Sequence, residues 1–168
     1  FDTVVFTNLT RDHLDFHENL ETYFNAKLKL FSAKMLKPST NASAVRAIIN
    51  LDDSFGHRVW EACDVLAWGY AINSHADIRA ADIVMTFEGT SFFVQTPMGS
   101  FPVRTTLLGR HNVYNILAAI GVGLSRGCSI ETLQQGIALL RCVPGRFEKI
   151  DEGQKYGVVV DYAHTDDA

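Results

Sequence analysis

The sequence has little cysteine, three residues among 168, and no two of them form a CxxC pair. An odd number of widely separated cysteines argues against a disulfide framework. We interpret Cys63, Cys128 and Cys142 as small buried hydrophobic residues in a reducing compartment, and we expect a cytoplasmic protein.

Long apolar runs and an excess of basic charge are also missing. The longest apolar stretch, residues 116–124, is far shorter than the roughly 18–20 residues that a membrane-spanning helix needs. The chain does not open with the basic and apolar segments of a signal peptide. Lys and Arg number 15 against 19 Asp and Glu, a net charge of −4 that disfavours general nucleic-acid binding. We therefore expect no membrane insertion and no nucleic-acid partner.

Two phosphate-binding signatures are absent from these 168 residues. Neither the GxxxxGK[ST] phosphate loop nor a GxGxxG motif after a strand occurs. Nothing in the sequence is therefore predicted to cradle a triphosphate through backbone amides. The first residue is not Met, and the last follows closely on an apolar run, so we expect a piece of a larger protein, truncated at both ends.

The segments that are present alternate between strand and helix patterns. Hydrophobic residues make up 47% and charged residues 20%, which is ordinary for a globular chain of about one domain. Short β-branched runs predict strands, and apolar residues spaced three and four apart predict helices. Alternation of this kind favours a parallel sheet covered by helices. The predicted order is strand 3–6, helix 18–36, strand 45–50, helix 54–62 and strand 64–69.

The pattern changes in the second half of the chain. Three antiparallel strands are predicted at 83–87, 91–95 and 101–107, the first two joined by a glycine turn at 88–90. Two helices follow at 111–126 and from Ser129, as N-cap, to about residue 141. A turn at 143–148 leads into a strand, and a last apolar strand follows at 156–161. We predict one α/β domain with a mostly parallel sheet, flanking helices and a small antiparallel sheet.

Lys27 is the first candidate functional residue. It lies three residues after Phe24 and four before Phe31, and therefore on the apolar stripe of its helix, whereas Lys29 points elsewhere. One interpretation is a side chain that packs its stem on the core and extends its ammonium group to water. The other is a desolvated lysine with a lowered pKa and a reactive amine.

The loop after the first strand is dense in ionisable groups. Residues 12–17 read DHLDFH, with two carboxylates and two imidazoles beyond the carboxyl end of the strand, where open α/β sheets bind ligands. His and Asp are metal ligands, but they are also common in loops and helix caps. The two histidines, His13 and His17, favour a site modestly.

Asn112 and Asn115 open the helix at 111–126. They are three residues apart and share a face. An asparagine amide offers a donor and an acceptor side by side, which suits the edge of a purine. The alternative for Asn112 is an N-cap role, which would not require Asn115.

Two charged residues complete the candidates. Asp161 ends a strand, where a carboxylate can accept hydrogen bonds from ribose hydroxyls or can simply hold a turn. Arg146 follows Pro144 and Gly145 in a turn, where it could bind phosphate bidentately or form an ordinary surface ion pair.

With these residues laid out, the sequence resembles the Mur ligase family. The resemblance lies in residues 7–17 (TNLTRDHLDFH), 23–27 (YFNAK), 109–115 (GRHNVYN), 144–148 (PGRFE) and 161–165 (DYAHT). The five motifs stand in family order over almost the whole chain. The pairing of RDHLDFH with DYAHT most resembles the branch that adds the third peptide residue of the peptidoglycan precursor.

The resemblance implies an ATP-dependent amide ligase with ATP and Mg²⁺ as cofactors. In that family a phosphoryl group passes to a substrate carboxylate, and the amine of an amino acid then attacks the acyl phosphate. Lys27 matches the family's carbamylated lysine, whose carbamate ligates or positions Mg²⁺, and His13 matches its Mg²⁺-ligating histidine. His17 carries no catalytic role over from the family and is expected to structure the loop.

The same resemblance assigns the nucleotide contacts. Asn112 and Asn115 match the pair that contacts adenine, and Arg146 matches an arginine near the phosphates. Asp161 matches the ribose-binding aspartate, and His164 lies in the same motif near the nucleotide.

The implied partners are UDP-N-acetylmuramoyl-L-alanyl-D-glutamate and an amino acid, meso-diaminopimelate or L-lysine. The chain would be part of the central ATP-binding domain. The family's phosphate loop and uridine-nucleotide domain would precede residue 1, and the domain that selects the amino acid would follow residue 168. Alternatives are another Mur ligase, a folylpolyglutamate-synthase-like ligase, or a non-catalytic nucleotide-binding relative. The piece alone is expected to be inactive.

Overall fold

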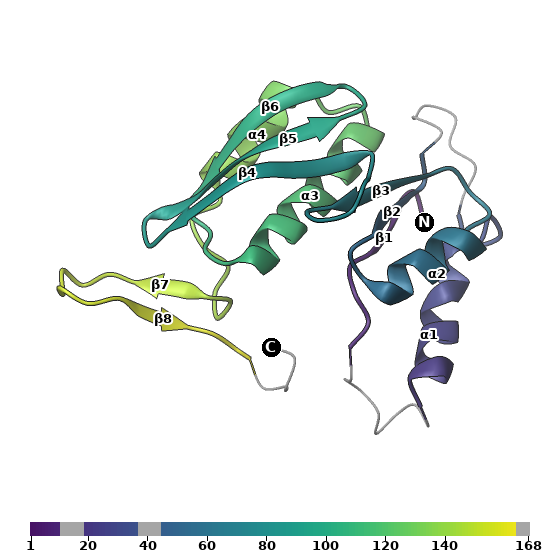
Figure 1. Cartoon of the computed structure of the whole chain (residues 1–168), viewed down its shortest axis with the longest axis horizontal. Coiled ribbons are helices and arrows are strands. Elements are labelled where there is room, and N and C mark those ends of the chain that lie inside the picture. The colour runs from purple at the N-terminus through teal and green to yellow at the C-terminus, as the bar shows by residue number, and fades with distance from the viewer. Residues whose placement is uncertain (11–18, 37–44, 164–168) are drawn as a thin grey trace.

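One sheet of six strands, in the order β1-β2-β3-β4-β5-β6, forms the centre of the chain (Figure 1). The computed structural model describes residues 1–10, 19–36 and 45–163. The strands are β1 (Val4–Phe6), β2 (Ala47–Asn50), β3 (Ala67–Ala71), β4 (Ile78–Thr86), β5 (Gly89–Thr96) and β6 (Gly99–Thr105). The pairs from β1 to β4 are parallel, and those from β4 to β6 are antiparallel.

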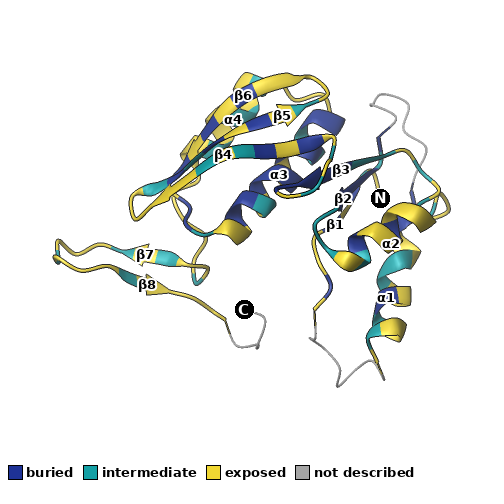
Figure 2. Cartoon of the chain, in the orientation of Figure 1, coloured by how far each residue is buried: buried dark blue, intermediate teal, exposed yellow. Residues whose placement is uncertain are grey.

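Helices cover both faces of the parallel part, because its strands are apolar on both sides. On one face α3 (Arg110–Ser125) packs on β2, β3 and β4, with Ile48 in its core. On the other face α1 (Leu20–Leu28), the short 3-10 helix η1 (Lys29–Phe31) and α2 (Ser54–Ala62) enclose Ala47 and Ile49. Figure 2 shows buried residues concentrated in β2, β3 and α3.

The antiparallel strands extend the sheet beyond β4 and pack on α4 (Ile130–Leu139) at β6. β4 pairs with β3 at Ile78 and Arg79 and with β5 at residues 79–81 and 84–86. The register with β5 shifts between Ala81 and Val84, with Asp82 at φ 53°, which marks a bulge.

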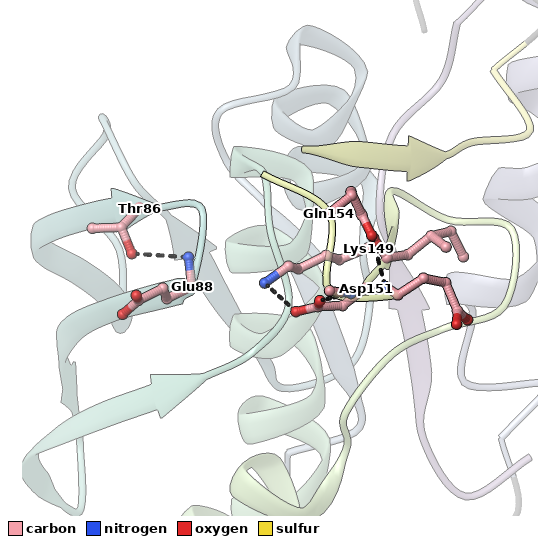
Figure 3. A network of polar contacts seen from close by, with 8 residues as sticks. Thr86, Glu88, Lys149, Asp151 and Gln154 are labelled. Atoms are coloured by element: carbon pink, nitrogen blue, oxygen red, sulfur yellow. Dashed lines mark hydrogen bonds and ion pairs between the residues drawn. The ribbon is translucent and has the colours of Figure 1, made fainter. Parts of the chain in front are cut away.

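A separate hairpin of β7 (Glu148–Ile150) and β8 (Val158–Val160) lies below the turn that joins β4 and β5 (Figure 1). Lys149 places its Nζ 5.1 Å from the ring centroid of Phe87 in that turn and 3.3 Å from Asp151 Oδ2. Figure 3 shows this ion pair beside Gln154, whose Nε2 donates to the Ile150 carbonyl at 2.7 Å. The same view shows the Glu88 N–H donating to Thr86 Oγ1 at 3.2 Å.

The predicted fold class is confirmed, and most elements lie within a few residues of their predicted places. The helix predicted at 18–36 is shorter: α1 begins after the N-cap Asn19, and the helical segment ends at Phe31. Ser32 is extended, and the Ala33 N–H donates to Asp64 Oδ1 at 2.6 Å instead of continuing the helix. A tertiary hydrogen bond therefore replaces the last predicted helical turn.

The interpretation of the cysteines as buried is wrong for two of the three. Cys63 is half-buried, whereas Cys128 and Cys142 are exposed, and all three are free thiols. None of the helices in the described ranges is both long enough and apolar enough to span a bilayer.

Candidate nucleotide-binding site

The carboxyl ends of β1, β2 and β3 meet at one edge of the sheet, because these strands are parallel. Asn50, at the end of β2, donates from Nδ2 to the Thr7 carbonyl at 2.8 Å, just beyond β1. The Tyr70 hydroxyl of β3 donates to the Phe6 carbonyl at 3.2 Å. The end of β1 and the start of the predicted loop are therefore held by side chains of β2 and β3.

Asp53 holds the first helix that leaves this edge. Its Oδ1 accepts from the N–H groups of Phe55 and Gly56 at 2.9 and 3.1 Å, so Asp53 is the N-cap of α2. Its Oδ2 accepts from the Leu9 N–H at 3.3 Å, which ties the loop after β1 to the same carboxylate.

Asp52, one residue earlier, accepts four hydrogen bonds at this edge, more than Asp53 does within the described residues. Its two oxygens accept from the N–H groups of residues 72, 73 and 74 at 2.7–2.8 Å and from the Tyr114 hydroxyl at 2.8 Å. Partial burial raises the pKa of the carboxyl, but the four hydrogen bonds outweigh it and hold the pKa well below its usual range. Asp52 is therefore ionised throughout the neutral range.

The two predicted asparagines lie together at the start of α3. The N-cap of α3 is Gly109, at φ 88°, so the alternative of an N-cap role for Asn112 is wrong. The buried Asn112 donates from Nδ2 to the Leu108 carbonyl at 2.7 Å, and its Oδ1 accepts from Asn115 Nδ2 at 3.3 Å. Asn115 itself is exposed, so its amide oxygen and its second N–H can face a ligand.

A cavity of about 320 Å³ opens beside these amides, between α3 and α4. Its polar groups are few, and its walls are mostly aliphatic, a combination typical of small-molecule sites. The lining residues include Asn112, Asn115, Leu107, Ile116, Leu133 and Ile137.

Asp161 and the turn at 144–148 form one unit. Asp161 Oδ2 accepts from the Phe147 N–H at 2.6 Å, and its Oδ1 accepts from the Ala163 N–H at 2.7 Å. The Tyr162 N–H donates to the Gly145 carbonyl at 2.8 Å. Asp161 therefore has the turn-holding role that the sequence allowed, and a carboxylate oxygen with one partner can still accept a ribose hydroxyl.

This unit adjoins the start of α3. The ring of Phe147 meets His111 edge-on, with centroids 5.9 Å apart. Arg146 holds its guanidinium 5.4 Å from the ring centroid of Tyr162, an aromatic contact that the sequence did not predict. The predicted contacts Asn112, Asn115, Arg146 and Asp161 thus belong to two adjoining segments.

Lys27 lies in a different part of the molecule. It is half-buried on α1, which packs on the opposite face of the sheet from α3, and its Nζ lies 4.8 Å from the ring centroid of Tyr23. His13 and His164 lie outside the described residues, as does His17. Among the residues that the structure does describe, no three His, Cys, Asp or Glu side chains cluster to hold a metal ion.

Sequence reasoning missed Asp52 and Tyr114. Sequence reasoning assigns no role to Asp52, and it includes Tyr114 only within the helix at 111–126 and the motif at 109–115. The available signal was Asp52 itself, a second carboxylate next to the helix cap Asp53 at the carboxyl end of a parallel strand.

Known proteins resemble this chain over its whole length. Residues 1–123 match the family described as Mur ligase middle domain. The chain is 46% identical to the UDP-N-acetylmuramoyl-L-alanyl-D-glutamate–2,6-diaminopimelate ligase of Solibacter usitatus and 44% identical to that of Bacillus cereus. Each match covers 100% of the chain, which spans about a third of the length of these relatives, 33% and 34%.

Solved structures give the same picture. A UDP-N-acetylmuramoyl-L-alanyl-D-glutamate–2,6-diaminopimelate ligase superposes with a TM-score of 0.79 at 34% identity, over 98% of this chain and 33% of that one. MurF from Acinetobacter baumannii superposes with a TM-score of 0.80 at 24% identity, over 94% of this chain and 33% of that one, and shows the shared fold. The match to the middle-domain family covers well over half of the chain, and the chain belongs to the Mur ligase family.

Proposed function

We propose that this chain is part of the central ATP-binding domain of a cytoplasmic ligase of peptidoglycan precursor synthesis. The ligase would join an amino acid to UDP-N-acetylmuramoyl-L-alanyl-D-glutamate, and a uridine-nucleotide domain and an amino-acid-selecting domain would flank this chain. Of the two amino acids expected, the names of the curated relatives favour 2,6-diaminopimelate over L-lysine.

The observation that carries this proposal is the pair of coupled amides that line the cavity between α3 and α4. Asn112 is fixed by its bond to Leu108, and it in turn orients Asn115. A preorganised amide pair beside an aliphatic slot can read the hydrogen-bonding edge of adenine while the slot excludes water. Asp161 and Arg146 lie on the adjoining segment, and we assign them to the ribose and to a phosphate.

The reaction would proceed through an acyl phosphate of the substrate carboxylate, with Mg²⁺ neutralising charge on the phosphates. Within this chain, the asparagine pair orients the base, Asp161 accepts from ribose, and Arg146 offers a planar pair of donors to phosphate. His164 would lie near the nucleotide. Mg²⁺ is proposed to lie near His13 and a carbamate on Lys27, an assignment that rests on the family resemblance.

Replacing Asn115 with Ala is expected to weaken ATP binding about tenfold in the full-length protein, because the base loses a hydrogen-bonding amide. Its melting temperature without ATP should barely change, since Asn115 is exposed. The affinity is read from melting temperature as ATP is titrated. Gln135→Ala, which removes an exposed amide from α4, is the control and should leave ATP affinity unchanged. Unchanged affinity in Asn115→Ala would contradict the adenine assignment.

The 168-residue chain by itself is expected to bind ATP with Mg²⁺ poorly, because these residues contain no phosphate loop. Isothermal titration calorimetry of the chain beside the full-length protein measures the difference. Affinity equal to that of the full-length protein would mean that the asparagine pair and the 144–148 turn suffice.

A further inference from the structure

Asp52 joins three segments that are distant in sequence. It follows β2, its oxygens accept from the N–H groups of residues 72–74 after β3, and its Oδ2 also accepts from the hydroxyl of Tyr114 on α3. Hydrogen bonds to an ionised acceptor are roughly twice as strong as neutral ones. The carboxylate therefore anchors α3 to the carboxyl edge of the sheet.

A second connection reinforces this anchor. Arg110, the first residue of α3, donates from Nη2 to Asn73 Oδ1 at 2.6 Å, and the Asn73 N–H donates in turn to Asp52. Arg110 and Tyr114 are four residues apart and share one face of the helix. The first two turns of α3 are therefore attached to Asp52, directly through Tyr114 and indirectly through Arg110 and Asn73.

Asn112 and Asn115 lie on the other side of the same turns. At 3.6 residues per turn, their mean direction is roughly 150° from that of Arg110 and Tyr114. Because a helical turn moves as a unit, a shift on the anchored side moves both amides relative to the segment that carries Asp161. Amide recognition requires placement within about half an ångström.

We propose that Asp52 and Tyr114 are positioning residues for the nucleotide site: they fix the start of α3 so that the Asn112–Asn115 pair meets the adenine edge. The inference rests on the proposed function. Neither residue lines the cavity beside the asparagine pair, and both act through the helix.

Tyr114→Phe tests this, because it removes only the hydroxyl and leaves the ring and the backbone bonds of Asp52 in place. In the full-length protein we expect the KM for ATP to rise roughly three- to tenfold, the effect of losing one such bond, while kcat changes less than twofold. Ser125→Ala is the matched control. It removes a buried hydroxyl bond, to the Val122 carbonyl at 2.8 Å, from the far end of the same helix.

The control separates positioning from general loosening of α3. Ser125→Ala should lower the melting temperature as Tyr114→Phe does but leave the KM for ATP unchanged, and an equal rise in both variants would overturn the proposal. Asn115→Ala is measured alongside. If Asn115→Ala raises the KM and Tyr114→Phe does not, the positioning role is overturned while the nucleotide site stands. If Asn115→Ala has no effect, the nucleotide site itself is overturned, and the positioning role with it.

Discussion

Lys27→Ala is expected to lower the ligase activity of the full-length protein by roughly 100-fold or more, the scale on which removing one charge-stabilising group acts. Lys27 is half-buried on α1, and its amine lies beside the ring of Tyr23. Within the described residues it forms no ion pair. Only a neutral amine adds CO₂, and the product is a carbamate and a released proton. Alanine has no amine and cannot form the carbamate, so the negatively charged oxygens of the carbamate would be lost.

Small carboxylates should restore part of the activity of Lys27→Ala, because acetate or formate can supply oxygens in the vacated space. Lys29→Ala, two residues along and exposed, is the control and should keep full activity. Labelled bicarbonate followed by NMR gives a readout besides activity: a carbamate signal is expected from the native protein and not from Lys27→Ala. Full activity in Lys27→Ala without any added carboxylate would refute the carbamate.

Gly56→Ala is expected to cause the largest loss of stability, about 3 kcal/mol in the free energy of unfolding. Gly56 lies in the first turn of α2, where a Cβ would fall 1.8 Å from the backbone oxygen of Asn50. A backbone atom at the end of a buried strand cannot rotate away, so α2 or the loop that carries Asp52 must shift. The melting temperature of the chain, followed by circular dichroism, should fall by roughly 6–12 °C.

Gly136→Ala is the matched control, because it makes the same change in α4 at a position where a Cβ would meet only open space. Alanine is favoured over glycine in a helix interior by about 1 kcal/mol, so this variant should melt roughly 2–4 °C higher than the native chain. Equal shifts in both variants would show that helix propensity alone, and not the approach to Asn50, governs Gly56.

Local signals in the sequence were enough to predict the helices that carry their own caps. The helix expected at 54–62 is α2, and Ser129 is the N-cap of α4 as predicted. The end of α1 could not be predicted, because the group that takes the Ala33 N–H is Asp64, far along the chain. The start of β4 was missed for a similar reason: Ile78 and Arg79 become strand residues by pairing with β3.

The candidate site was predictable where one segment held both members of a pair. Asn112 and Asn115 share a helix, and their mutual hydrogen bond follows from their spacing. The role of Asp52 depends on hydrogen bonds from residues 72–74 and 114, which no local sequence pattern predicts. The distance between Lys27 and the nucleotide contacts depends on which face of the sheet each helix covers. Local sequence patterns do not predict this choice of face either.

The hydrogen bond from the Phe147 N–H to Asp161 determines where this chain could accept inserted residues. The two bonded residues flank the hairpin of β7 and β8, one just before β7 and the other just after β8. Gly153, near the tip of the hairpin, has open space around it. Extra residues at 152–154 would lengthen the tip while leaving Arg146 and Asp161 in register. A single residue inserted between β8 and Asp161 would instead move Asp161 away from the Phe147 N–H and from the turn that carries Arg146. Tags, linkers and natural length variation are therefore best accommodated at the tip, where they leave the spacing of the two motifs intact.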